Sequence, residues 1–363
     1  MNYHLPEMKN GTITTKVVCA LVFLTFTFLW LYMFQSDTLA VAQHRLSHGV
    51  THYNRTVGAV LITLFLFLVQ QGVFAVTRLS RRTHALTYLP SFMLLAFLSS
   101  FTPNSAHPSA LPSHPSFWLW LAPTVLVIWI VSVWLSRQIL PFEKDEGQQT
   151  GLFSRRMWIN LCIMAAMMVV VASLSNTNAV YHFKAHAETS LMRGDADEAL
   201  RVGEESLETD RDLTMLRAFA LSLRGEMGER LFHYPIAGTG ADLLPRRSRL
   251  LILPTDSVKR HLSMKTIADY ELCSLLIDRD LDGFAQQLPK SYSLDNLPKH
   301  YKEALVMYQH THANPKLVYS DPVTEQEWEN YQQMKQQYTN PKERRLNLLK
   351  NHKDTYWYYY DGN

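Results

Sequence analysis

Five long apolar stretches limit the possible folds of this chain more than any other feature. They occupy residues 17–34, 57–76, 85–101, 117–135 and 157–174. A helix that crosses the hydrocarbon core of a bilayer needs roughly 20 mostly apolar residues. We therefore predict five membrane-spanning helices within a transmembrane domain at residues 1–174. The third stretch is the weakest candidate, because it is short and contains Pro90.

The basic residues between these stretches predict their orientation. The segment before the first stretch, the second loop and the fourth loop together carry Lys9, Lys16, Arg78, Arg81, Arg82, Arg137, Lys144, Arg155 and Arg156. The first loop has only Arg45 and Arg55, and the third loop has no basic residue. Short basic loops stay on the cytoplasmic side. Five spans in a bacterial inner membrane therefore place the amino terminus in the cytoplasm and residues 175–363 in the periplasm.

The amino terminus has an alternative interpretation as a cleaved signal peptide. The segment "TLAVAQ" ends the first stretch with an Ala-x-Ala pattern, which would fit a peptide of residues 1–42. Because 18 apolar residues are long for the apolar region of a signal peptide, we favour a retained helix. Cleavage would leave the remaining topology unchanged.

Asp, Glu, Lys, Arg and His are absent from the interiors of the five stretches. The polar exceptions are Gln70 and Gln71 in the second stretch and Asn160 in the fifth. Ion-coupled transporters and proton relays use buried ionisable groups, so this composition argues against a secondary transporter. The composition does not exclude an enzyme whose site lies at the membrane surface.

Residues 175–363 have the composition of a soluble helical domain, with 24 basic and 27 acidic residues. Within it, "MRGDADEAL" (192–200) and "LRGEMGERL" (223–231) align 31 residues apart, and "LIDRDLDGFAQQL" (276–288) is a weaker third copy. This period resembles tetratricopeptide (TPR) repeats, which are stacked helix pairs. Most copies lack the consensus Trp and closing Pro, so an irregular helical domain with a chance repeat is the alternative. The predicted fold is all-α, with a five-helix transmembrane bundle followed by a TPR-like domain.

Three smaller features of the soluble part also lead to predictions. The segment "RLLIL" (249–253) is a candidate short strand, and we expect the acids to lie at solvated helix positions. The terminal segment "KDTYWYYYDGN" either packs its aromatic residues on the last helices or offers a sticky edge to a partner. The catalytic motifs of serine hydrolases, zinc proteases and nucleotide-binding loops are absent.

Histidines form the most unusual chemical feature of the sequence. The stretch "AVAQHRLSHGVTHYNR" (40–55) spaces three of them four residues apart, and the predicted topology brings four more to the same membrane face. All seven are candidate metal or haem ligands: His44, His48, His52, His107, His114, His182 and His186. From a straight helix His44 and His52 would lie roughly 12 Å apart along the axis, so the first three cannot bind one ion alone. A polar surface or a contact between helices is the alternative.

Two regions carry a family resemblance. The run "HGVTHYNRTVGAVLITLFLFLVQQGV" with "LSRRTHALTYLPSF", and the later "LPKHYKEALVMY" and "DTYWYYY", resemble a family of uncharacterised polytopic inner-membrane proteins of Bacteroidota-type bacteria. The resemblance implies an inner-membrane protein with a periplasmic helical domain. It implies no activity and no functional residues.

Together these observations predict a binding protein rather than an enzyme. We expect the membrane helices to anchor a periplasmic domain that holds a protein or peptide partner in a cell-envelope assembly. The alternative is an envelope enzyme or carrier that uses the histidines for a metal, a haem or a lipid-phosphate group. Nucleic acid is not an expected partner, because the net charge of +3 comes from basic loops beside the membrane.

Overall fold

The computed structural model describes residues 7–79, 81–101, 116–139, 154–245, 250–261 and 264–362. Within these residues the regular structure is helical, and there is no strand. The chain divides into two compact units, Met1–Asn178 and Ala179–Asn363. Each unit has its own buried hydrophobic core.

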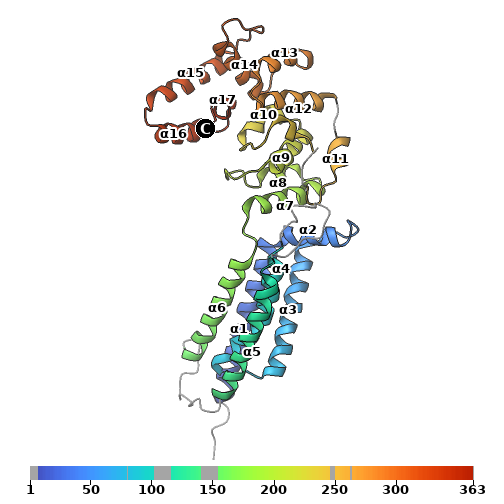
Figure 1. Cartoon of the computed structure of the whole chain (residues 1–363), viewed down its shortest axis with the longest axis vertical. Helices are drawn as coiled ribbons and strands as arrows, with labels where there is room; N and C mark the ends of the chain where they lie inside the picture. Colours follow the sequence, from blue (N-terminus) through green and yellow to red (C-terminus); the bar gives the residue numbers. More distant parts are fainter. Residues whose placement is uncertain are drawn as a thin grey trace, which may run out of the picture. The chain divides into compact units, whose positions relative to one another are not determined.

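The first unit is a bundle of long apolar helices. Its elements are α1 (Glu7–Leu29), the π-helix η1 (Trp30–Phe34), α2 (Ser36–Leu46), α3 (Arg55–Thr77), the 3₁₀ helix η2 (Arg81–Tyr88), α4 (Leu89–Ser99), α5 (Trp118–Ile139) and α6 (Arg155–Leu174). Helix α1 packs against both α3 and α6, and all three helices pack against the η2–α4 segment (Figure 1). Helix α5 packs against η2 and α4.

Within the described residues of this unit, four helices are long and apolar enough to cross a membrane: Ile13–Phe34, Arg55–Thr77, Trp118–Gln138 and Arg155–Leu174. The third predicted span, residues 85–101, instead belongs partly to η2 and partly to the 11-residue α4. Pro90 lies in the first turn of α4. Proline lacks an N–H and disfavours an α-helical residue before it, so a new α-helix begins here instead of one continuous span.

The polar residues within the apolar helices contact this irregular segment. Asn160 Oδ1 accepts the backbone N–H of Ala85 at 2.7 Å, and Gln70 Nε2 donates to Thr87 Oγ1 at 3.0 Å. From α5, Trp129 Nε1 donates to the carbonyl of Leu86 at 2.9 Å. Non-helical backbone among apolar helices needs such partners inside the protein. Gln70 and Asn160, two of the three polar exceptions of the sequence, therefore support the η2 segment.

The second unit consists of short helices that pack in successive pairs (Figure 1). They are α7 (Ala179–Met192), α8 (Ala196–Arg201), α9 (Arg211–Arg224), α10 (Met227–Arg230), η4 (Leu231–His233), η5 (Gly240–Leu243), α11 (Thr255–Arg260), α12 (Met264–Ile277), α13 (Leu281–Ser291), α14 (Lys299–Thr311), α15 (Pro322–Gln337), α16 (Pro341–His352) and α17 (Tyr356–Tyr360). Each pair buries apolar side chains against its neighbours in one common core.

The turns of three pairs share one backbone geometry. Gly194, Gly225 and Arg279 have left-handed φ values of 80°, 70° and 60°. In each turn the next residue donates its N–H to the carbonyl five residues earlier: Asp195 to Ser190, Glu226 to Leu221, and Asp280 to Leu275. This bond is typical of a Schellman helix end. The three turns lie in the three segments that align in the sequence.

The candidate strand at residues 249–253 does not form within its described residues. Glu188, which is fully buried on α7, gathers the N–H groups of this segment instead. Its carboxylate accepts from Leu251 at 2.8 Å, Ile252 at 2.7 Å and Leu253 at 2.9 Å. Three bonds to one carboxylate replace the ladder that a strand would need.

The aromatic end of the chain packs onto the core. Tyr356 and Trp357 have no exposed surface, and the tyrosines at 358–360 are partly buried against the same cluster. Thr355 caps the start of the short helix α17, and its side chain accepts the N–H of Tyr358. The interpretation that this segment packs on the last helices therefore describes it, because Tyr356 and Trp357 are fully buried.

Candidate functional site

The first three histidines do not share a helix. Helix α2 ends at Leu46, and His48 (φ 51°) and Gly49 (φ 81°) both adopt left-handed conformations. The ring of His44 lies over Gly49, 3.2 Å from the position that a Cβ there would take. Burial lowers the pKa of His44, and the neighbouring positive charge of His52 lowers it further. His44 thus lies against the turn that follows α2, and helical spacing does not align it with His48 and His52.

The other candidate ligands are separate from this turn in the sequence. His182 and His186 lie on α7 of the second unit, where His186 Nε2 is 3.2 Å from Glu198 Oε1. His107 and His114 lie outside the described residues. Among the side chains that the structure describes, no group of three or more His, Cys, Asp and Glu is placed to hold a metal ion. The seven-histidine site stays a prediction.

A deeply buried polar network is centred on α14. His300 and Glu303 are one turn apart on this helix, and their exposed fractions are 0% and 1%. His300 Nδ1 lies 2.9 Å from Glu303 Oε2. Residues three apart on a helix are neighbours on its surface, so the local sequence "HYKE" is sufficient to form this pair.

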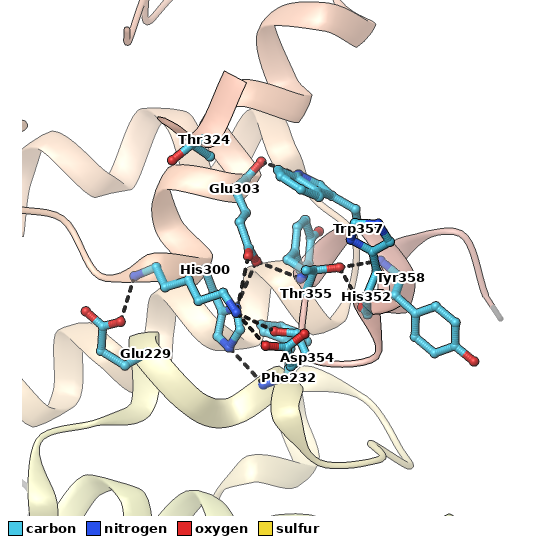
Figure 2. Close-up of polar contacts among 12 residues, drawn as sticks. Glu229, Phe232, His300, Glu303, Thr324, His352, Asp354, Thr355, Trp357 and Tyr358 are labelled. Atoms are coloured by element: carbon cyan, nitrogen blue, oxygen red, sulfur yellow. Dashed lines mark hydrogen bonds and ion pairs between the residues drawn. The ribbon is translucent and has the colours of Figure 1, made fainter. Parts of the chain in front are cut away.

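The backbone of η4 determines the tautomer of His300. Phe232 donates its backbone N–H to His300 Nε2 at 3.3 Å (Figure 2). This nitrogen is therefore the acceptor of a neutral ring, and Nδ1 carries the proton that is donated to Glu303. The pair is a neutral imidazole that is hydrogen-bonded to a carboxylate.

Glu303 also positions the end of the chain. Its Oε2 accepts the backbone N–H of Tyr356 at 2.7 Å, and its carbonyl accepts the indole N–H of Trp357 at 2.8 Å. Figure 2 shows the Glu303 side chain between His300 and the segment that contains Thr355 and Trp357. One residue of α14 thus satisfies two donors of α17.

A half-exposed ion pair flanks this buried part. Lys299 Nζ lies 2.8 Å from Asp354 Oδ2, and the backbone N–H of Lys299 donates to Glu229 Oε2 at 3.0 Å. Burial acts to raise the pKa of Asp354, but the hydrogen bond and the charge of Lys299 outweigh it and leave that pKa below its usual value. The pair links the start of α14 to the turn before α17.

His233 lies beside the network but is not bonded into it. Its ring centroid is 5.4 Å from that of His300, and its Nε2 is buried without a hydrogen-bond partner among the described residues. Burial, with the nearby His300 and Lys299, lowers the pKa of His233 to about 4. The ring is therefore neutral at physiological pH.

The geometry of this network is structural, not catalytic. A carboxylate that orients an imidazole is also the arrangement of a general base, but such a base must reach a substrate proton. Here the second nitrogen of His300 is occupied by Phe232, and neither His300 nor Glu303 is exposed. The network can hold α10, α14 and α17 together, and nothing external can reach its imidazole.

A second buried cluster joins α12, α13 and α14. Asp269 Oδ1 accepts the hydroxyls of Tyr292 at 2.5 Å and Tyr301 at 2.9 Å. The thiol of Cys273 lies 3.6 Å from the Tyr301 hydroxyl, and burial raises the pKa of Cys273 to about 12. The thiol is therefore protonated at neutral pH and unsuited to nucleophilic chemistry.

The expectation that the acids occupy solvated positions is wrong for four of the described acids. Glu188, Asp212, Asp269 and Glu303 are at most 8% exposed. His300 shares a helical stripe with Tyr301 and Ala304, so its burial follows from periodicity. Glu303 lies off that stripe and is buried because α17 covers the other side of the helix, which helical periodicity alone does not reveal.

A family model matches the part of the chain that contains most of this network. Residues 256–363 match a family model described as "Family of unknown function (DUF6057)". The match includes α12 to α17, and so contains His300, Glu303 and Trp357 but not Phe232 or His233. No curated protein and no solved structure matches the chain. The matched family assigns no activity to these residues.

Proposed function

We propose that the protein is a scaffold or adaptor of a bacterial inner membrane, whose periplasmic TPR-like domain binds a protein or peptide in a cell-envelope assembly. The recurrence of one turn at Gly194, Gly225 and Arg279 carries this proposal. Each helix pair can bury its apolar face only against a neighbour, so such stacks form extended surfaces that bind other chains. Because the polar clusters are deeply buried, the partner is recognised by the surface of the domain in this proposal.

We propose that five spans, and not four, anchor this domain in the membrane. The 3₁₀ helix η2 has eight residues and α4 has eleven. At rises of about 2.0 and 1.5 Å per residue, the two segments together extend over roughly 30 Å, the thickness of the hydrocarbon core. Asn160 and Trp129 supply partners to the η2 backbone, which is what irregular backbone in a membrane requires.

The number of spans has a direct test, because it decides where the two ends of the chain lie. Five spans place the termini on opposite sides of the membrane, and four place them on the same side. A periplasm-active reporter fused after Asn363 should be active, and the same reporter fused before Met1 should be silent. Equal behaviour of both fusions would reject the fifth span, and reversed activity would reject the orientation.

Exposed apolar side chains near the α14–α15 connection are the proposed contacts with the partner. Val318 is 71% exposed and Val323 is 68% exposed, and Leu346 on α16 is 65% exposed. Apolar side chains that are buried on binding contribute most when they lie together at the centre of an interface. Val318 and Val323 lie five residues apart around the start of α15 and provide such a centre.

Site-specific photocrosslinking in cells tests this surface. A photoreactive residue at Val323 should give one discrete adduct, and Val318→Asp should abolish that adduct without changing the thermal unfolding of the purified chain. Leu207→Asp is the matched control, since Leu207 is 66% exposed and lies on the α8–α9 connection. The proposed surface fails if no discrete adduct forms, or if both aspartate variants behave alike.

A further inference from the structure

An open cavity lies at the ends of α4, α5 and α6. It shares no residue with the predicted histidine site or with the α14 network. Its volume is about 620 Å³, and it is lined by Ser100, Phe117 and residues 173–178. All of these residues belong to the first unit. This volume lies within the roughly 300–1,000 Å³ that ligand pockets usually have.

Hydrogen bonds build one wall of this cavity. The backbone N–H of Asn176 donates to the carbonyl of Ser99 at 3.0 Å, and its side-chain amide donates to the carbonyl of Phe101 at 3.1 Å. Ser175 donates its hydroxyl to Val171 at 2.7 Å. The segment after α6 is thereby tied to the end of α4, so the wall is formed before any ligand arrives.

The chemistry of the lining selects a neutral ligand. Its side chains are serine, threonine, asparagine, leucine and phenylalanine, with no ionisable group among them. A phosphate would find no cation on this lining and an ammonium group no carboxylate, and unpaired charges are costly to remove from water. Ser173 and Ser175 donate their hydroxyls to the helix carbonyls of Val169 and Val171, so each oxygen retains lone pairs for an incoming O–H.

One aromatic residue, Phe117, also lines the cavity. Phe117 is 43% exposed and stacks on Trp118, with ring centroids 5.7 Å apart. Trp118 is only 6% exposed, and its indole N–H has no hydrogen-bond partner within the described part of the chain. An exposed ring beside acceptor oxygens suits a sugar, which has an apolar C–H face and a rim of hydroxyls.

We propose that this cavity binds a neutral, hydroxyl-rich headgroup, with a sugar ring on Phe117 and its hydroxyls on Ser173 and Ser175. The cavity lies where the apolar helices α5 and α6 end, so a sugar carried by a lipid can reach it with its chains beside those helices. The inference does not rest on the proposed protein partner. It requires only that these helices lie in a membrane.

Photolabelling of the full chain tests the cavity. The chain is placed in phosphatidylcholine nanodiscs with a glucosyl diacylglycerol that carries a diazirine on its sugar, and labelled residues are mapped by mass spectrometry. Label should concentrate at residues 173–178. Ser173→Trp, which fills the cavity, should lower labelling about tenfold, the effect of losing about 1.4 kcal/mol of binding free energy. Ser132→Trp is the matched control, because Ser132 makes the same 2.8 Å bond to a carbonyl of its own helix, at Ile128 on α5.

The outcomes of this labelling experiment distinguish the possible ligands. Competition by free methyl glucoside identifies a free sugar as the ligand, and labelling without competition identifies the lipid headgroup. Equal labelling by diazirine probes of sugar-free diacylglycerol or of phosphatidylethanolamine would overturn the proposal, as would equal labelling of the two tryptophan variants. If Ser173→Trp does not fold, Phe117→Leu, which retains an apolar side chain without a ring, must lower labelling for the proposal to stand.

Discussion

Glu303 Oε2 accepts the backbone N–H of Tyr356 at 2.7 Å, and the same oxygen lies 2.9 Å from His300 Nδ1. A single carboxylate oxygen on α14 therefore meets both the imidazole of its own helix and the first turn of α17. Both donors are buried, so neither can turn to water if the carboxylate is removed. The end of the chain depends on a side chain 53 residues before it.

Glu303→Ala should lower the free energy of unfolding by about 3 kcal/mol, because it leaves two buried donors without acceptors. Chemical denaturation of the full chain in detergent, followed by tryptophan fluorescence, measures this change, since Trp357 lies in the affected helix. Glu303→Gln should cost less, because its amide oxygen still accepts one hydrogen bond.

An exposed pair that joins α14 to α15 is the control for this experiment. His310 Nε2 lies 2.8 Å from Glu325 Oε2, but the two side chains are 47% and 32% exposed. Glu325→Ala should therefore cost less than about 1 kcal/mol, as solvent-accessible pairs do. Equal costs at Glu303 and Glu325 would contradict a holding role for the buried carboxylate.

The pH dependence of stability should carry a contribution from His233. Burial lowers its pKa from 6.5 in the unfolded chain to about 4 in the folded one. Between these values the unfolded chain binds more protons, so this contribution falls as the pH falls from about 6.5 to about 4. His233 is partly accessible, and screening reduces the expected loss to about 1 kcal/mol.

His233→Gln isolates this contribution, because glutamine does not titrate. The difference in unfolding free energy between wild type and His233→Gln should be constant above about pH 6.5 and should move against the wild type below it. His352, whose pKa is also lowered by burial, acts in the same direction in both proteins and cancels in the comparison. A difference that is independent of pH would show that His233 titrates normally in the folded chain.

The repeated turn makes a prediction about backbone conformation alone. A Cβ added at Gly225 would meet no atom within 4 Å, so Gly225→Ala tests only the left-handed φ of 70°. The substitution should destabilise the second unit by about 1 kcal/mol. Gly225→Asn should cost less, since asparagine tolerates this conformation. Hydrogen exchange in α9 and α10 measures both costs. If Gly225→Ala and Gly225→Asn lower the stability equally, the left-handed φ is not the cause.

The sequence was informative wherever one local pattern decided the structure. Apolar length alone predicted four of the helices that can cross a membrane, and the aligned Gly–acid segments identified three turns that share one geometry. Arg279 shows how far such a pattern extends, because it takes the left-handed position without being glycine. The interruption of the third stretch also had a visible local cause in Pro90.

Long-range contacts decided the features that the sequence did not reveal. Glu188 is buried because the segment at residues 251–253 brings three N–H groups to it, 63 residues away in the chain. Glu303 is buried because α17 returns to cover α14. The even spacing of the histidines does not continue along one helix at His48, because α2 ends at Leu46 and a left-handed turn with Gly49 follows. Whether these histidines bind a metal stays a prediction.

Asn160 tests whether the polar residues of the bundle support its irregular segment. Its side chain accepts the N–H of Ala85 in η2 at 2.7 Å, and both groups are buried. Asn160→Leu should lower the thermal stability of the chain in detergent, at a cost of about 1–2 kcal/mol for the unpaired N–H. Gln71→Leu is the control, because Gln71 is exposed and bonds only to the neighbouring Gln70 among the contacts the structure gives it. Unchanged stability of Asn160→Leu would mean that η2 holds its shape without this bond, and would remove one support for a fifth span.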